Sequence, residues 1–197
     1  MSNEFKIAVV GASGAVGEVM LSILAEHGFA AENVVALASE RSAGKPVDFG
    51  RHSLTVDDLD GFDFSGVKYA LFSAGGSVSE KYAPLAAEAG AIVIDNTSAF
   101  RYIDDIPLVV PEVNPHRLEG VGPGAIIANP NCSTIQMLVA LAPIHRAAGI
   151  DRINVATYQS VSGAGATALR ELVEQTVDRL NFREPTLNKF VQPIAFN

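Results

Sequence analysis

The residues best suited to chemistry lie in the hexapeptide Asn129–Thr134 (NPNCST), which contains the only cysteine of the 197-residue chain. The apolar residues 125–128 before it predict a buried strand, and residues 135–141 after it predict a helix. Cys132 is therefore expected at a strand-to-helix turn, where free backbone N–H groups and the helix dipole favour a thiolate. Such a thiolate can act as a nucleophile, and the same N–H groups can hold an oxyanion. The alternative is a buried structural cysteine, a common role for free cysteines.

A strand, a glycine turn and a helix near the start of the chain predict a nucleotide site. The β-branched run Lys6–Val10 is followed by glycines spaced G-x-x-G-x-x-G and then by apolar residues at helical spacing. In dinucleotide-binding units such a turn lets the backbone approach the pyrophosphate at a helix N-terminus. The commoner spacing is G-x-G-x-x-G, and a plain tight turn is the alternative. The residues predicted to bind the cofactor here are Gly11, Ser13, Gly14, Ala15, Val16 and Gly17.

The second predicted strand, Val34–Ala38, carries the signal for the type of cofactor. A unit that binds NAD would place Asp or Glu at the end of this strand against the ribose hydroxyl. Here Arg41 could pair with a 2′-phosphate, with Ser39 and Ser42 beside it, which points to NADP. An inward-facing Glu40 would instead favour NAD, and Arg41 could also be a solvated loop charge.

Two further predicted strands end in small polar residues. Tyr69–Ser73 runs into Ala74-Gly75-Gly76-Ser77, and Ala91–Asp95 runs into the polar loop 96–101. Ligands bind outside the carboxyl ends of strands in open α/β sheets, so these loops are expected at the cofactor. The additional cofactor-binding residues predicted from them are Ser73, Gly75, Gly76 and Ser98.

The alternation of strands and helices up to Cys132 predicts an α/β fold with a Rossmann-like, doubly wound parallel sheet. Residues 47–66 are expected to form an excursion of short strands and turns. A helix is predicted over Glu80–Ala89, with an irregular first turn because it contains Pro84. Leu108–Pro115 is expected to be extended, and the helix after Cys132 to end near Ala148.

The remaining residues predict the beginning of a second, α+β domain. Arg152–Ser160 alternates in polarity, as a strand with one covered face does. Ala168–Leu180 predicts an amphipathic helix, and the tail after it shows no closing element. The apolar stripe of this helix consists of Leu169, Leu172, Val173, Val177 and Leu180.

Composition narrows the class of protein. Hydrophobic residues make up 48% and charged residues 18%, which is enough for a sizeable core. A net charge of -8 without a Lys/Arg cluster argues against nucleic acid and anionic membranes as partners. The single cysteine fits a reducing compartment. No secretory signal pattern and no apolar run of roughly 18 residues occurs, so we expect a soluble cytoplasmic protein.

Taken together, these motifs resemble those of the bacterial aspartate-semialdehyde dehydrogenases over the whole chain. N-acetyl-glutamyl-phosphate reductase and glyceraldehyde-3-phosphate dehydrogenase share the layout, but the cysteine context and the Gln159 segment are more similar to the aspartate-semialdehyde family. The segments that carry the resemblance are Gly11–Gly17, Ser39–Gly44, Ser98–Arg101, Val110–Asn114, Asn131–Thr134 and Gln159–Gly165.

The resemblance implies reduction of aspartyl phosphate by NADPH to aspartate semialdehyde, in the biosynthesis of lysine, threonine and methionine. Cys132 would form a thioester, Arg101 would bind the phosphate group with help from Asn131, and Gln159 would orient the substrate. It also implies a homodimer, an NADP-binding domain over residues 1–133 and an incomplete catalytic and dimerisation domain over residues 134–197. No metal site is predicted.

The chain departs from the family in length. Family members are longer, and their acid/base histidine and substrate-carboxylate arginine lie in the second half. His145 is 13 residues beyond Cys132, roughly 20 Å along a helix, whereas proton transfer needs about 3 Å. The remaining histidines, also predicted to be surface or packing residues, are His27, His52 and His116.

The chain is therefore expected to be the cofactor half of an enzyme together with its nucleophile, and to turn over very slowly or not at all on its own. A rival hypothesis is a non-catalytic nucleotide-binding or assembly module. The presence of Cys132, Arg101 and Gln159 together favours the enzyme, because a binding module has no use for all three.

Overall fold

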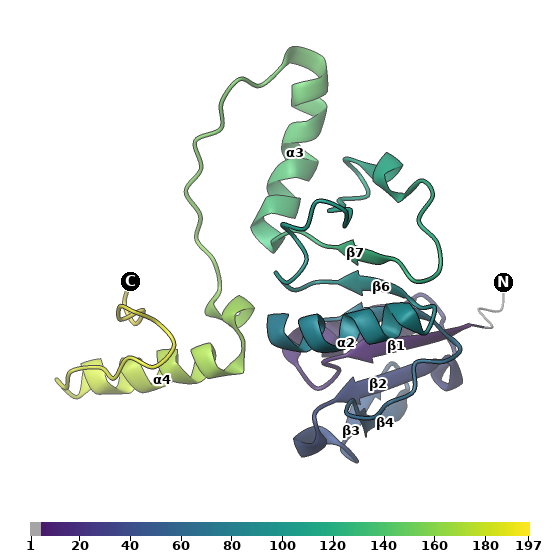
Figure 1. Ribbon diagram of the computed structural model, residues 1–197. Coiled ribbons are helices and arrows are strands. Elements are labelled where there is room, and N and C mark those ends of the chain that lie inside the picture. The colour runs from purple at the N-terminus through teal and green to yellow at the C-terminus, as the bar shows by residue number, and fades with distance from the viewer. Residues whose placement is uncertain (1–4) are drawn as a thin grey trace. The chain divides into compact units, whose positions relative to one another are not determined.

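The chain divides near Asp151 into a first unit of α/β structure and a second unit, Arg152–Asn197 (Figure 1). A computed structural model describes residues 5–197. The first unit ends at Asp151, later in the chain than the domain boundary expected at residue 133. It therefore includes the helix that begins at Cys132.

The first unit is built on a seven-stranded sheet with the strand order β3-β4-β2-β1-β5-β6-β7. All neighbouring strands are parallel except β3 and β4, which are antiparallel. The order reverses at β1, between β2 and β5, which is where ligands bind in such sheets. The parallel α/β fold predicted from the sequence is confirmed. The strands are β1 (Lys6–Val10), β2 (Val34–Ala38), β3 (Pro46–Phe49), β4 (His52–Asp58), β5 (Val67–Phe72), β6 (Ile92–Asp95) and β7 (Ile126–Ala128).

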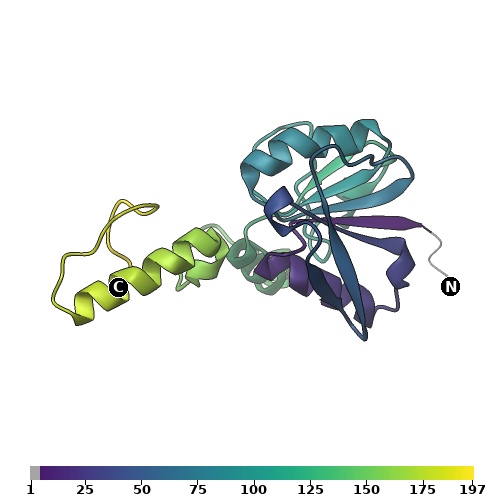
Figure 2. The same cartoon turned by 90° about the horizontal axis from the view of Figure 1, so that it is seen from below.

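Two helices cover opposite faces of this sheet, α1 (Ala15–Glu26) and α2 (Gly76–Glu88) (Figure 2). Alternate residues of β1 explain the two layers, because side chains of a strand point to opposite faces. Ala8 and Val10 pack in the buried apolar cluster that includes residues of α2, whereas Val9 packs in a second cluster that includes residues of α1. All three are fully buried, so the strand reads as a continuous apolar run.

The predicted excursion after β2 is a β-hairpin. The antiparallel strands β3 and β4 pair Phe49 with His52 across a tight turn, and Gly50 supplies the positive φ of 61° that the turn needs. Val56 of β4 then pairs in parallel with Ala36 of β2, so the hairpin extends the sheet.

Helix α2 begins at Gly76, earlier than the expected Glu80, so Pro84 lies in the helix interior and the prediction of an irregular first turn at Pro84 is wrong. The first turn is formed by Val78 and Ser79, whose backbone N–H groups donate to the carbonyl of Gly75. Proline removes one helical hydrogen bond, but the burial of neighbouring Ala83 favours the helix.

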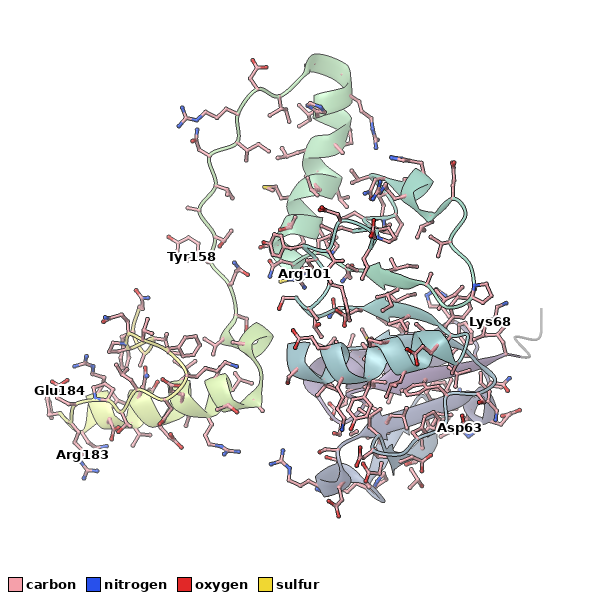
Figure 3. All side chains as sticks on the ribbon, viewed as in Figure 1. Asp63, Lys68, Arg101, Tyr158, Arg183 and Glu184 are labelled. Atoms are coloured by element: carbon pink, nitrogen blue, oxygen red, sulfur yellow. The ribbon has the colours of Figure 1, made fainter. Side chains whose placement is uncertain are left out.

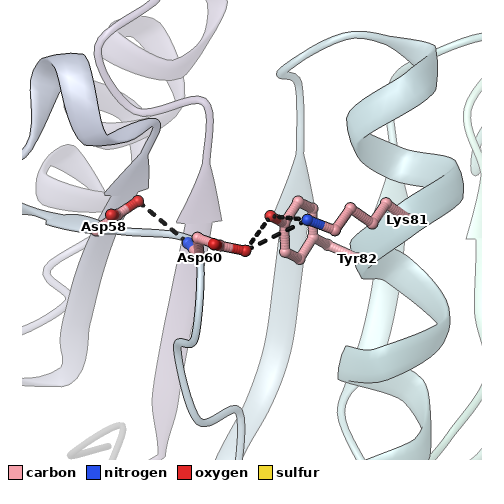
Figure 4. A network of polar contacts seen from close by, with 4 residues as sticks. All are labelled: Asp58, Asp60, Lys81 and Tyr82. Atoms are coloured by element: carbon pink, nitrogen blue, oxygen red, sulfur yellow. Dashed lines mark hydrogen bonds and ion pairs between the residues drawn. The ribbon is translucent and has the colours of Figure 1, made fainter.

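A surface network joins the loop after β4 to α2 (Figure 4). The hydroxyl of Tyr82 donates to Asp60 Oδ1 at 2.8 Å, and Lys81 Nζ lies 3.3 Å from the same oxygen. The Tyr82 hydrogen bond, followed by the hydrogen bond and charge of Lys81, holds the pKa of Asp60 below its usual range. Because these groups are exposed, the network orients the loop rather than adding much stability.

The second unit contains a short 3-10 helix, η4 (Val161–Ala164), and the helix α4 (Ala166–Leu180). The strand predicted over Arg152–Ser160 is absent: these residues form exposed coil, and Tyr158 projects fully into solvent (Figure 3). A strand needs a neighbour for its backbone N–H and C=O groups, and no described residue outside this segment pairs with it as a strand.

The tail after α4 covers the polar side of this helix, not its apolar stripe. Glu171 is 2% exposed and its carboxylate accepts backbone N–H bonds from Asn188, Lys189 and Phe190. Gln175 is fully buried and accepts the backbone N–H of Ile194 at 2.8 Å. As expected, no helix or strand follows α4 among the described residues, and the tail is held instead by hydrogen bonds to these buried polar groups.

Candidate functional site

Cys132 is the first residue of α3 (Cys132–Ala148), directly after the turn that follows β7. Asn131 caps the helix: its Oδ1 accepts from the Ser133 backbone N–H at 3.1 Å and from the Ser133 hydroxyl at 2.6 Å. Cys132 is exposed, with its Sγ 3.9 Å from Asn131 Oδ1. The strand-to-helix placement is confirmed, and the alternative of a buried structural cysteine is wrong. The first backbone N–H groups of α3 lie at the same end of the helix and can hold an oxyanion.

Arg101 lies beside the start of α3 (Figure 3). Its Nε donates to the backbone carbonyl of Asn129 at 2.9 Å, and its Nη2 donates to the carbonyl of Asn96 at 3.2 Å. Asn129 precedes Cys132 by three residues, so the guanidinium and the thiol share one end of the sheet. An arginine has five N–H donors, and these two bonds leave others for an oxyanion.

The glycine turn between β1 and α1 has the close approaches that a phosphate cradle needs. Gly11 has φ of +92°, and a Cβ there would lie 2.9 Å from the backbone nitrogen of Ala74. A Cβ on Gly17 would lie 2.1 Å from the carbonyl oxygen of Gly11. The N-cap of α1, Gly14, makes no side-chain cap bond, so the first N–H groups of the helix are available to an anion.

Contacts between segments bring the predicted cofactor residues to one edge of the sheet. Ser13 Oγ donates to Ser42 Oγ at 3.2 Å, which joins the glycine turn to the end of β2. The Ser73 N–H donates to the carbonyl of Val10 at 2.9 Å, next to Gly11. A Cβ on Gly76 would lie 3.9 Å from Ser98 Oγ, so the loops after β5 and β6 also meet.

The residues that could distinguish NADP from NAD are all at the surface. Ser39, Glu40 and Arg41 are exposed around the 3-10 helix η2 (Glu40–Ser42). All three side chains are therefore accessible to a nucleotide bound at the end of β2.

Gln159 lies in the second unit, within the exposed coil, where its side-chain amide donates to Thr157 Oγ1 at 2.9 Å. Its role toward Cys132 stays a prediction. The four histidines, predicted at the surface or in packing, are all exposed; they are His27, His52, His116 and His145.

The sequence reasoning placed Asn96 and Asn129 in segments of interest, the polar loop 96–101 and the hexapeptide, but gave neither residue a role of its own. Each directly follows the last residue of a parallel strand, β6 and β7 respectively. A polar residue at that position is a signal for the ligand-binding edge, and it could have been used.

Among residues 5–197 no group of three or more His, Cys, Asp and Glu is placed to hold a metal ion. None of the described helices is long and apolar enough to cross a membrane. An open hollow at the amino end of β7, lined in part by Asp105, His116 and Arg117, contains none of the predicted site residues.

The sequence matches two family models in chain order. Residues 6–121 match "Semialdehyde dehydrogenase, NAD binding domain", and residues 141–197 match "Semialdehyde dehydrogenase, dimerisation domain". The chain belongs to the semialdehyde dehydrogenase family. Its membership agrees with the glycine cradle, the cysteine turn and the parallel sheet described above.

Similar curated proteins include aspartate-semialdehyde dehydrogenase 2 of Vibrio cholerae, 57% identical over 197 residues, and the aspartate-semialdehyde dehydrogenase of Legionella pneumophila, 56% identical. The alignments cover 100% of this chain but 58% and 57% of those proteins. The chain thus spans under two thirds of the length of these relatives.

Solved structures agree. Aspartate semialdehyde dehydrogenase II from Vibrio cholerae, complexed with ASA, has a TM-score of 0.88 at 56% identity and covers all of this chain and 58% of its own. An aspartate semialdehyde dehydrogenase from Candida albicans with NADP has a TM-score of 0.61 at 26% identity, over 74% of this chain and 48% of its own. The expected resemblance to aspartate-semialdehyde dehydrogenases is confirmed.

Proposed function

We propose that this chain is the cofactor-binding and nucleophile-bearing part of an NADP-dependent aspartate-semialdehyde dehydrogenase of amino-acid biosynthesis. The observation that carries the proposal is the exposed Cys132 at the N-terminus of α3, with Arg101 anchored to the backbone of Asn129. Three relatives at 56–57% identity that are named aspartate-semialdehyde dehydrogenases favour this substrate over that of N-acetyl-glutamyl-phosphate reductase.

In the proposed reaction, the Cys132 thiolate attacks the acyl carbon of aspartyl phosphate. The bond from that carbon to the phosphate oxygen breaks, phosphate leaves, and a thioester to Sγ remains. Arg101 binds the oxygens of the phosphate as the phosphate leaves. The N–H groups at the start of α3 stabilise the negative charge on the oxygen of the acyl group. NADPH, when bound, would supply the hydride to the acyl carbon of the thioester and would itself be oxidised to NADP⁺. Rupture of the carbon–sulfur bond then releases aspartate semialdehyde and restores the thiolate.

The residues present fit a dinucleotide. The cradle at Gly11 and Gly17 is one that any Cβ would fill, and the α1 N-terminus offers N–H groups to a pyrophosphate. Arg41 would take the 2′-phosphate, with Ser39 and Ser42 as hydrogen-bond donors. The loops at Ser73, Gly75–Gly76 and Ser98 would border the nicotinamide half.

Arg41→Ala is expected to weaken NADPH binding roughly tenfold to a hundredfold, with little effect on NADH, because a charge-assisted hydrogen bond to the 2′-phosphate is lost. Titration of both nucleotides by fluorescence measures the two dissociation constants. Arg51→Ala, in the exposed turn between β3 and β4, is the control that removes the same charge elsewhere. Equal losses for NADPH and NADH would mean that Arg41 does not contact a 2′-phosphate.

We also propose the functional division expected from the sequence, with residues 1–133 as the NADP-binding domain and residues 134–197 as part of a catalytic and dimerisation domain. The gap between the two family models, residues 122–140, contains that boundary. The match to a dimerisation domain supports a homodimer as the native state. Gln159 would orient the substrate, and the single cysteine fits a cytoplasmic location.

The purified 197-residue chain is expected to bind NADP(H) but to turn over slowly. His145 lies 13 residues along α3 from Cys132, roughly 20 Å away, too far to act as its base. Loss of a general acid/base costs about 10²–10⁴-fold. The assay is NADP- and phosphate-dependent oxidation of aspartate semialdehyde, with Cys132→Ala as the control. Turnover of about 1–10³ per second that vanishes in the control would overturn the view of an incomplete enzyme. Binding of NADP(H) without any modification of Cys132 by the aldehyde would favour a non-catalytic binding module.

A further inference from the structure

Two asparagines hold Arg101 between the ends of β6 and β7. The backbone carbonyls of Asn96 and Asn129 accept the two hydrogen bonds of the guanidinium. Their side chains also bond to each other, Asn129 Nδ2 donating to Asn96 Oδ1 at 2.5 Å. The three residues therefore form a closed ring of contacts, in which the amide pair fixes the separation of the two carbonyls.

The ring rests on a rigid base. Asn96 donates its backbone N–H to the carbonyl of Phe72, and Asn129 donates its own to the carbonyl of Asp95. Asp95 is fully buried, and its carboxylate accepts the hydroxyl of Ser79 at 2.6 Å from the first turn of α2. Thr97 donates its hydroxyl to the same carboxylate at 2.7 Å. The backbone that carries Asn96 is thus held from β5, α2 and the loop itself.

The other side of the ring has less support from the sheet. β7 has three residues and is the edge strand of the sheet, with the bridge from Leu108 to Ala128 as its outer contact. Beyond its end the chain turns through Asn129 and Asn131 to Cys132. The hydrogen bond between the side chains of Asn129 and Asn96 therefore links the turn after β7 to the end of β6, which the sheet and α2 support.

We propose that Asn96 and Asn129 are positioning residues that set the guanidinium of Arg101 relative to the thiol of Cys132. A free arginine side chain loses much rotamer entropy on binding an anion, and a pre-oriented fork loses less. The amide pair places Arg101 before substrate arrives. This inference rests on the proposed function, in which Arg101 binds the phosphate group of the substrate.

The test uses the unique thiol as a local probe. Iodoacetate is an anion and iodoacetamide is its neutral analogue, so the ratio of their alkylation rates at Cys132 reports positive charge near Sγ. Arg101→Ala is expected to lower this ratio. Asn96→Ala and Asn129→Ala are expected to lower it roughly threefold to tenfold, the size of a moderate electrostatic change at a partly exposed site.

The deciding experiment measures the effect of each asparagine variant on the ratio of alkylation rates in the Arg101→Ala protein, which lacks the guanidinium. If the asparagines act through Arg101, adding Asn96→Ala or Asn129→Ala to Arg101→Ala changes the ratio no further. Asn154→Ala, in the exposed coil of the second unit, is the control and should leave the ratio unchanged. Asn96→Ser and Asn129→Ser, which keep a polar group but cannot span the pair, replace any alanine variant that melts below the assay temperature.

The outcomes separate the two proposals. A ratio lowered by Arg101→Ala but unchanged by the asparagine variants overturns the positioning role and leaves the function intact. If the asparagine variants lower the ratio as much in the Arg101→Ala background as in the wild type, the asparagines act on the thiol without Arg101. That result also overturns the positioning role. A ratio unchanged by Arg101→Ala overturns both the anion-binding role of Arg101 and the positioning built on it.

Discussion

Gly17→Ala is expected to destabilise the first unit by about 3 kcal/mol and to remove nucleotide binding, because the helix and the glycine turn touch at this position. A Cβ on Gly17 would lie 2.1 Å from the carbonyl oxygen of Gly11 and 2.7 Å from the Cα of Ala12. Both atoms are backbone, so relief requires moving α1 away from the end of β1. That movement displaces the N–H groups proposed to hold the pyrophosphate.

Thermal unfolding followed by circular dichroism and an NADPH titration measure the two effects of Gly17→Ala. Gly122→Ala is the matched control, because a Cβ there would meet no atom within 4 Å and the backbone is not in the left-handed region. A Gly17→Ala variant that melts with the wild type and binds NADPH equally would show that α1 can shift without consequence. The glycine turn would then be an ordinary turn, as the sequence analysis allowed.

Much of the first unit could be predicted because its signals are local. The apolar runs at Lys6–Val10 and Val34–Ala38 and the glycine spacing each specify an element within a few residues. The end of the helix after Cys132 was predicted correctly near Ala148, because Gly149 follows it. Its start was expected later, from the apolar residues 135–141, whereas Asn131 caps the helix and α3 begins at Cys132 itself.

Other features depend on partners distant in sequence. A strand over Arg152–Ser160 requires a neighbouring strand, and periodicity alone cannot supply one. The pairing of the β3–β4 hairpin with β2, and the amide pair of Asn96 and Asn129, join segments that only the fold brings together. Sequence patterns identified which residues could do chemistry, but not which contacts would hold them.

In helix α4 the face that the tail buries is not the apolar stripe named from the sequence. The apolar stripe contains exposed residues such as Val173 and Leu180, whereas Glu171 and Gln175 are buried under the tail. A carboxylate satisfied by three backbone N–H groups can be buried, and the tail supplies those groups. An exposed apolar stripe on a segment that matches a dimerisation domain agrees with the proposed homodimer.

Glu171→Ala is accordingly expected to release the tail from α4 while leaving the first unit folded. The backbone N–H groups of Asn188, Lys189 and Phe190 would lose their acceptor, and the amide of Gln175 would lose its bond to Glu171 Oε1 at 3.0 Å. Hydrogen exchange of these three amides, followed by NMR, should rise toward that of an unfolded chain. Glu174→Ala, an exposed carboxylate on the same helix, should change nothing.

The same contact predicts a dependence on pH. Burial by itself raises the pKa of Glu171, but the hydrogen bonds from Lys189, Asn188, Phe190 and Gln175 outweigh it and leave the pKa below the ordinary value of 4.5. A lowered pKa in the folded state means that the ionised carboxylate stabilises the tail fully above pH 4.5. That stabilisation is lost as the pH falls through the lowered value, when the carboxylate takes up a proton. Amide shifts of Asn188–Phe190 should therefore stay constant from pH 7 to about 4.5 and move toward unfolded values below it. In Glu171→Gln, which cannot ionise, this step should disappear, and a step of equal size in that variant would show that another group fastens the tail.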